Sequence, residues 1–277
     1  MNALAVLLVF GSVIVANGKL DPRIVGGQVA AWGKYPYQVS IRQSSRHICG
    51  GSIINKYFIL TAAHCIYYVS ADRIKVVVGS NYLKQLGVYY QAAELFYPVS
   101  YDDKLIIDDI GLIRVNGGIE FNELVQPILL APVYDINPGE TAVVTGWGRL
   151  STDNVISNLL QEIYLTVISQ EECKDKYWSV TETNICTLTK IGEGVCNGDS
   201  GGPMVVSGSQ VGIVSYGYPC AKGYPDVYTR VYPYIDWINN ITSQNYSTGN
   251  AVDVRLNKWT TLLLATATLL GHKHLIL

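Results

Sequence analysis

The chain has 277 residues, a length that one large domain or two fused half-domains can fill with a substantial core. Its formal net charge of −2 argues against nucleic acid or an anionic membrane surface as the main partner. The cysteines form an even set of six between residues 49 and 220, as expected of disulfides made in an oxidising compartment.

The N-terminal segment indicates export. Leu4 to Val15 form an apolar run, and the small-residue stretch Ala16-Asn17-Gly18 follows it. The run is short for a membrane span and resembles a secretory signal peptide over residues 1–18, although an ordinary buried helix has the same composition. The even cysteine set independently favours export, so we expect a secreted, extracellular protein.

Short apolar or alternating runs dominate the long region after residue 24. They are rich in Val, Ile and Tyr and are separated by Gly, Asn, Asp and Pro, which is typical of an all-β barrel or sandwich. The runs include YQVSI, FILTAA, IKVVV, IGLIRV, TAVVTGW, QEIYLTV, PMVVS and QVGIVS. Residues 231–242 have a helical pattern instead, because Val231, Tyr234, Ile235 and Ile238 recur on one helix face. This helix is expected to close the domain.

The C-terminal tail, residues 246–277, differs in composition from the rest. A polar stretch with small residues precedes the apolar run Trp259–Leu270, which resembles a signal for a GPI anchor. The run is short, and His272–His274 interrupts it, so a trimmed or disordered extension is the alternative. Two glycosylation sequons begin at Asn240 and Asn245, of which Asn245, past the helix, is the expected site.

Three short motifs contain the residue types of nucleophilic catalysis. His64 follows an apolar strand in LTAAHC, where a lone histidine is more often structural than catalytic. Asp109 stands at the start of an apolar strand in DDIGLIRV, where a carboxylate is costly unless it is hydrogen-bonded. Ser200 lies in GDSGGP, whose glycines let the backbone approach a substrate closely. The order His, Asp, Ser with these flanks makes the combination specific.

These motifs identify a resemblance. From Ile24 to about Gln244 the chain resembles the chymotrypsin/trypsin family of serine endopeptidases, and more narrowly the short-propeptide chymotrypsin-like enzymes of arthropods. The matching motifs are IVGG, LTAAHC, DIGLI, TGWG, GDSGGP and VYTRV. The resemblance implies an all-β protease domain over residues 24–245. It would contain two packed six-stranded antiparallel β-barrels, about 24–125 and 126–230, with a C-terminal helix and the site in the cleft between the barrels.

The resemblance assigns roles to the three motif residues. Ser200 would be the nucleophile, His64 its general base and acid, and Asp109 the buried group that orients the histidine. Asp103 and Asp108 are rival carboxylates, but the alignment of DIGLI favours Asp109.

The resemblance also implies an oxyanion hole and a support for the buried aspartate. The backbone N–H groups of Gly198 and Ser200 would bind the oxyanion, and Ser215 would support Asp109.

The resemblance implies that the enzyme is made as a zymogen. Residues 19–23 would be an activation propeptide that is cut between Arg23 and Ile24. The new Ile24 α-ammonium would pair with Asp199, which precedes the serine, and a buried charge pair of this kind needs both partners. The resemblance also selects three disulfides from the fifteen possible pairings: Cys49–Cys65, Cys173–Cys186 and Cys196–Cys220.

The specificity pocket departs from both the trypsin and the chymotrypsin pattern. Trypsin-like members carry aspartate on the pocket floor, where this chain has Gly194, while Asp226 stands on a wall where most relatives have glycine. Certain arthropod collagenolytic proteases have a similar arrangement and broad pockets. The uncharged floor favours substrates with Phe, Tyr or Leu before the cleaved bond. The Asp226 carboxylate either binds the cation of a substrate Arg or Lys or forms an internal hydrogen bond. The substrate-binding residues implied are Gly194, Val195, Asn197, Ser215, Gly217 and Asp226.

No cofactor and no metal are expected, because the loop GSNYLKQLGVYYQ lacks the acidic residues with which some relatives bind calcium. The expected partners are protein or peptide substrates, an activating protease and protein protease inhibitors, with no nucleic acid and with a monomeric enzyme. A membrane partner is expected only if the tail is an anchor signal. Two alternative hypotheses are a catalytically silent homologue that acts as a binding protein and a membrane-tethered adhesion or structural protein.

Overall fold

The computed structural model describes residues 25–84, 87–132, 136–150, 156–188, 190–218 and 220–244. Several sequence predictions lie outside these residues: the signal peptide 1–18, the propeptide 19–23, the cleavage residues Arg23 and Ile24, the sequon at Asn245 and the tail 246–277.

The first half of the domain is a closed barrel of six antiparallel strands in the order β2-β3-β4-β7-β6-β5. Its strands are rich in fully buried Val, Ile and Leu, such as Val39, Leu60 and Ile113. The strands are β2 (Gln38–Gln43), β3 (Arg46–Ile53), β4 (Phe58–Thr61), β5 (Ile74–Val78), β6 (Val88–Phe96) and β7 (Gly111–Val115).

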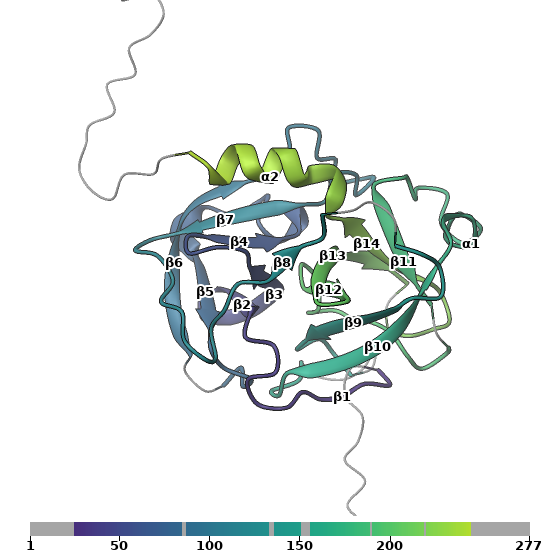
Figure 1. Cartoon of the computed structure of the whole chain (residues 1–277), viewed down its shortest axis with the longest axis horizontal. Helices are drawn as coiled ribbons and strands as arrows, with labels where there is room; N and C mark the ends of the chain where they lie inside the picture. The colour runs from purple at the N-terminus through teal and green to yellow at the C-terminus, as the bar shows by residue number, and fades with distance from the viewer. Residues whose placement is uncertain are drawn as a thin grey trace, which may run out of the picture. The chain divides into compact units, whose positions relative to one another are not determined.

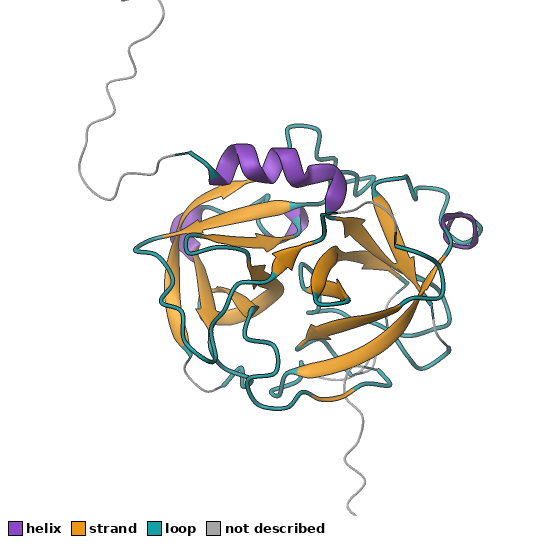
Figure 2. Ribbon diagram, viewed as in Figure 1, coloured by secondary structure: helices purple, strands orange, loops and turns teal. Residues whose placement is uncertain are grey.

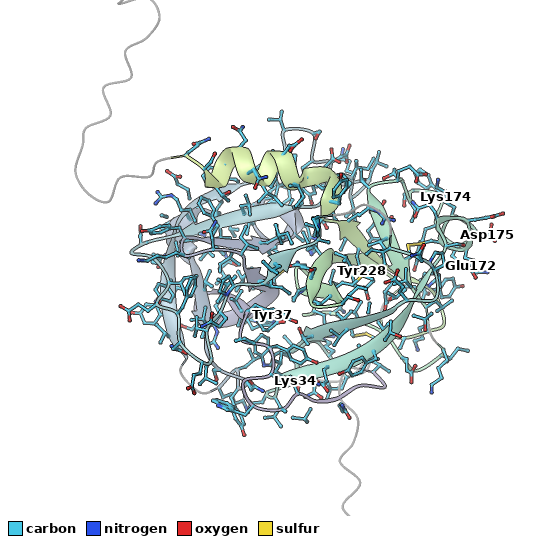
Figure 3. All side chains as sticks on the ribbon, in the orientation of Figure 1. Lys34, Tyr37, Glu172, Lys174, Asp175 and Tyr228 are labelled. Carbon is cyan, nitrogen blue, oxygen red and sulfur yellow. A yellow bond between two sulfur atoms is a disulfide. The ribbon has the colours of Figure 1, made fainter. Side chains whose placement is uncertain are left out.

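The second half forms another six-stranded ring, which closes because β9 pairs with both β10 and β12. Its core is apolar around Val144, Ile163 and Met204, and Tyr228 lies among its strands (Figure 3). Figure 1 shows the first barrel in purple to blue and the second in teal to green, on opposite sides of the domain. The strands are β9 (Thr141–Gly146), β10 (Gln161–Ile168), β11 (Asn184–Thr187), β12 (Pro203–Val206), β13 (Ser209–Gly217) and β14 (Asp226–Arg230).

Two short strands extend the second barrel. β8 (Leu129–Leu130) pairs with β13 in parallel, and β1 (Gln28–Val29) pairs with β10. An isolated bridge also joins Val25 to Gly194. The start of the described chain therefore lies against the second barrel, although the expected boundaries assigned it to the first.

Buried polar pairs join the two barrels. Ser52 of β3 donates to Gln210 of β13 at 2.5 Å, and Thr145 of β9 donates to Gln38 of β2 at 2.5 Å. Buried polar groups need such partners, since an unpaired one costs about 1–3 kcal/mol. The pairs fix how the barrels meet, and therefore the shape of the cleft between them.

Helices are few, as Figure 2 shows in purple. The expected helix over 231–242 is present as the 3-10 turn η3 (Tyr232–Tyr234) followed by α2 (Ile235–Thr242). The helix α1 (Gln170–Lys174) was not expected, because five residues carry too little periodicity. Its signal is a capping box, in which Ser169 and Glu172 satisfy each other's backbone N–H groups. Within the described part of the chain, no helix has the length and apolar character needed to cross a membrane.

The three disulfides of the structure are the pairs that the resemblance implied: Cys49–Cys65, Cys173–Cys186 and Cys196–Cys220. Each closes a loop of 13 to 24 residues, a size for which chain-entropy models give roughly 3 kcal/mol.

Candidate active site

His64 and Asp109 meet in the cleft. His64 lies on the 3-10 turn η1 (Ala63–Cys65) just after β4, and Asp109 lies just before β7, so the pairing of β4 with β7 brings them together. His64 Nδ1 lies 2.8 Å from Asp109 Oδ2, and the His64 backbone N–H donates to Asp109 Oδ1 at 2.9 Å. Ser215 Oγ from β13 of the other barrel also donates to Asp109 Oδ2, at 2.5 Å. The carboxylate is therefore fully buried and held from both barrels.

Opposing effects set the protonation of this pair. Burial acts to lower the pKa of His64, but the Asp109 charge and the hydrogen bond to it outweigh burial and raise that pKa. Burial acts to raise the pKa of Asp109, but His64 and the Ser215 hydrogen bond lower it. The arrangement keeps Asp109 ionised and makes His64 a better proton acceptor.

The two rival carboxylates point to other partners. Asp108 accepts a hydrogen bond from the Tyr234 hydroxyl at 2.6 Å, and Asp103 accepts one from the Tyr68 hydroxyl. Among the described contacts, Asp109 is the carboxylate that touches His64.

Ser200 lies in the turn before β12, next to β3. Its carbonyl accepts a hydrogen bond from Gly50 N–H at 2.8 Å, which fixes the turn against the first barrel. Ser200 and His64 line the same hollow. The described contacts contain no hydrogen bond between Ser200 Oγ and His64 Nε2, a bond that is commonly loose before substrate binds.

Asp199 occupies a fully buried position behind Ser200. Its carboxylate accepts hydrogen bonds from Gly148 N–H at 2.7 Å and Cys196 N–H at 3.0 Å. A Cβ on Gly146 or on Gly148 would lie 2.1 Å from one of its oxygens, which explains both glycines of TGWG. Burial raises the pKa of Asp199 to about 6, although these two hydrogen bonds oppose the shift.

His47 is a site residue that the sequence analysis did not identify. Its Nε2 lies 2.9 Å from the Gly198 carbonyl oxygen, and its Nδ1 lies 2.9 Å from Ser40 Oγ. Burial lowers the pKa of His47 to about 4, so the ring is neutral at physiological pH, and its Nε2–H donates to Gly198. The sequence feature that could have identified it is its position in HICGG, two residues before Cys49.

The turn around Gly198 presents two free donors. Gly198 has φ +103°, a conformation that favours glycine. Among the described hydrogen bonds, the N–H groups of Gly198 and Ser200 donate to no protein acceptor.

A hollow of about 220 Å³ opens beside Ser200. Asp226 lies in its wall almost completely buried, and its Oδ2 accepts a hydrogen bond from Val195 N–H at 2.9 Å. Burial raises the pKa of Asp226 to about 7; the Asp199 charge adds to the rise, while the Val195 hydrogen bond opposes it. The structure thus brings together five of the six predicted pocket residues: Val195, Asn197, Ser215, Gly217 and Asp226.

Gly194 contributes differently from the prediction. It is not part of the lining of the hollow, and it packs behind Asp226 instead. Its role in the pocket is therefore to leave room for that carboxylate.

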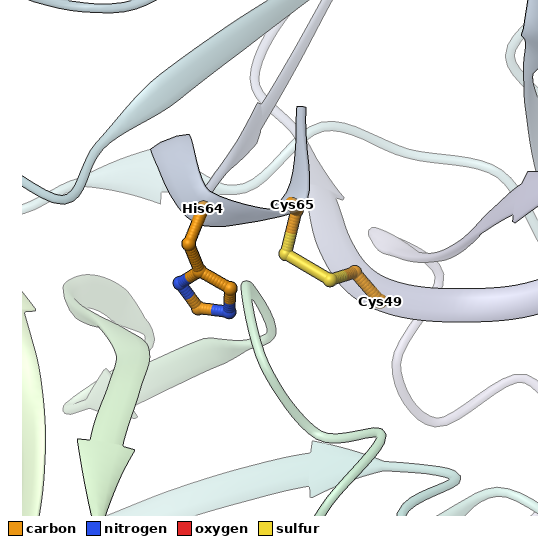
Figure 4. A group of neighbouring side chains, drawn as sticks. All are labelled: Cys49, His64 and Cys65. Atoms are coloured by element: carbon orange, nitrogen blue, oxygen red, sulfur yellow. A yellow bond between two sulfur atoms is a disulfide. The ribbon is translucent and has the colours of Figure 1, made fainter. Parts of the chain in front are cut away.

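Cys49, His64 and Cys65 are close enough together to suggest a metal site. Figure 4 shows the two sulfurs bonded to each other beside the His64 ring. A disulfide offers no thiolate, so the cluster retains a single ligand and does not fit a metal ion.

Comparison with known proteins agrees with this geometry. The family model described as Trypsin matches residues 24–238. Chymotrypsin-2 of Vespa crabro is 50% identical over 215 residues, which cover 78% of this chain and 98% of the wasp protein. Trypsin delta of Drosophila melanogaster is 37% identical over 226 residues, covering 79% of this chain and 88% of the fly protein. The chain is therefore a serine endopeptidase and belongs to the chymotrypsin/trypsin family, where it resembles the arthropod enzymes.

Proposed function

We propose that this endopeptidase is secreted as a zymogen and, once cut at Arg23–Ile24, hydrolyses peptide bonds that follow large apolar residues. The observation that carries the proposal is the His64–Asp109–Ser215 contact around the buried Asp109 carboxylate, beside a hollow that Ser200 and Ser215 line.

The proposed mechanism uses an acyl-enzyme. Ser200 Oγ attacks the substrate carbonyl while His64 Nε2 takes its proton, and Asp109 stabilises the imidazolium. The N–H groups of Gly198 and Ser200 bind the developing oxyanion, and loss of one such donor costs about 100- to 1000-fold in turnover in comparable sites. His64 then gives its proton to the leaving amine. A water molecule takes the place of the amine and releases the acyl group by the same steps in reverse.

The proposed activation rests on Asp199. This carboxylate is fully buried, and its described partners are two backbone N–H groups without a cation. Gly194 N–H donates to the Val25 carbonyl at 3.2 Å, so the residue after the new N-terminus is tied to the loop that leads to Asp199. An Ile24 α-ammonium generated by cleavage would complete the buried pair and order the oxyanion turn.

The proposed preference is for Phe, Tyr or Leu before the cleaved bond. It is supported by the internal hydrogen bond of Asp226 and by the similarity to a protein named chymotrypsin. The competing preference for Arg or Lys also has support, because Asp226 lines the hollow. In that case a substrate cation would meet the carboxylate.

The discriminating test is kcat/KM of the activated enzyme on peptides that vary only in the residue before the cleaved bond: Phe, Tyr, Leu, Ala, Arg and Lys. We expect the aromatic and Leu peptides to lead and Arg to be at least about 1000-fold worse, which is about 4 kcal/mol. An Arg peptide within about tenfold of Phe would establish the broad, Asp226-dependent preference instead.

The enzyme would act outside the cell. Its partners would be protein substrates, an activating protease and protein inhibitors, and it would act as a monomer. Asn240 lies exposed on α2, which is compatible with glycosylation there as well as at Asn245. Mass spectrometry of the secreted protein would identify both sugars and the true N-terminus.

A further inference from the structure

A second hollow, of about 340 Å³, adjoins the catalytic residues on the side away from Asp226. Ser200 lines both hollows, whereas His64 lines only this one. Because His64 gives its proton to the leaving amine, the amine side of the substrate must pass next to His64. The second hollow therefore receives the residues that follow the cleaved bond.

Apart from Gln43 and the two catalytic residues, the lining of this hollow is apolar or aromatic. Ile48, Val69 and the Cys49–Cys65 disulfide form its sides, and Tyr68 forms an aromatic wall. Of the described residues that line it, none carries a full charge apart from His64 when protonated. Burial of a large apolar side chain against such a surface makes binding more favourable, whereas a small side chain contributes little.

Tyr68 is held in place although 79% of its surface is exposed. Its hydroxyl donates to Asp103, which belongs to the separate loop that leads to Asp109. Its ring packs edge-on against Tyr67, with 4.6 Å between the ring centroids.

Tyr67 is itself anchored. It contacts Tyr97 and Tyr101 with centroid distances of 5.1 and 5.0 Å, and Tyr101 is buried. The Tyr68 side chain is therefore already ordered, so it loses little conformational entropy when a ligand packs against it.

We propose that Tyr68, tethered by Asp103, makes the enzyme select peptides with a large apolar or aromatic residue directly after the cleaved bond. The inference rests on the peptidase activity and on Ser200 as the nucleophile, and it is independent of which residue precedes the bond.

The test is the partition of the acyl-enzyme between water and added amino-acid amides. In aminolysis the amine nitrogen forms a new C–N bond, the bond between the acyl carbon and Ser200 Oγ breaks, and the amine proton passes through His64 to Ser200. The acyl-enzyme is made from the best ester in the panel above, and the products with Leu-amide, Phe-amide and Gly-amide are quantified by chromatography. The ratio of these products does not depend on the active fraction of the enzyme.

We expect the Leu and Phe amides to be preferred over Gly-amide by about tenfold or more, the factor that burial of one large side chain supplies. Tyr68→Ala should reduce the preference to about threefold or less. Tyr68→Phe and Asp103→Ala each remove the same hydrogen bond, so they should reduce it partly and by equal factors, and the double variant should be no worse than either. Tyr89→Ala removes another exposed tyrosine, on β6, and should leave the ratio unchanged.

A wild-type enzyme that uses all three amides equally would overturn the proposal. So would a Tyr68→Ala enzyme that keeps the full preference. If the enzyme prefers a residue before the bond other than the one proposed above, a different ester acylates it best. The partition ratio remains measurable in that case.

Discussion

The carboxylate of Asp226 occupies the space that a side chain at position 194 would need. A Cβ on Gly194 would lie 2.7 Å from Asp226 Oδ2, closer than carbon and oxygen approach without displacement. The two positions are therefore coupled: the Asp226 carboxylate fits in the wall because position 194 has no side chain.

Gly194→Ala should destabilise the protein by about 1–3 kcal/mol, the usual cost of overpacking. Backbone strain adds to this cost because Gly194 has φ +153°. The matched control is Gly208→Ala, which has φ +82° but nothing within 4 Å of the new Cβ, so it should cost less. Gly194→Ala/Asp226→Gly should recover the steric part. Urea unfolding would measure all four proteins, and equal losses for the two single variants would contradict the account.

Asp226 should make stability fall as the pH rises. The pKa of Asp226 is raised from 3.8 to about 7, so between these values the native state holds a proton that the unfolded state has released. The contribution of Asp226 to stability is therefore highest below pH 4, declines by about 4 kcal/mol at most towards pH 7 and then levels off. Asp226→Asn should remove this decline. The measurement is the difference in unfolding free energy between wild type and variant at pH 4 to 8, which cancels the contribution of Asp199. A constant difference would show that Asp226 titrates normally.

Asp109→Asn should lower kcat by about 10⁴-fold, because an amide cannot hold the neutral His64 tautomer that accepts the Ser200 proton. The control is Asp108→Asn, whose carboxylate contacts Tyr234 and not His64. It should retain activity within a few-fold. Steady-state kinetics on one good substrate suffices, and comparable losses in the two variants would be inconsistent with the assignment.

Extending the N-terminus of the activated enzyme by one residue before Ile24 should leave it nearly inactive. The extra residue would displace the ammonium from Asp199, whose buried charge would then lack its partner. Asp199→Asn should have a similar effect, because it removes the other half of the pair. Active-site titration with a fluorophosphonate would measure the functional fraction of each protein, and full labelling of the extended form would refute the activation model.

The local sequence was sufficient to identify the family, the all-β class and the motif residues His64, Asp109 and Ser200. Strand alternation and glycine-rich turns are encoded within a few residues, so they are visible without the fold. The capping box of α1 was equally local, but five residues were too few to stand out.

Only the tertiary structure decided which side chains meet. The resemblance favoured Asp109 over Asp108, but only the structure shows what each one contacts: both precede β7, and Asp109 meets His64 whereas Asp108 meets Tyr234. The structure also placed His47 on the carbonyl of Gly198, 151 residues away, and the Asp226 carboxylate in the space next to Gly194. Contacts of this kind depend on the closure of two barrels and on the way they pack. A pattern within one segment cannot encode them, since each needs a second segment whose position is set by the whole fold.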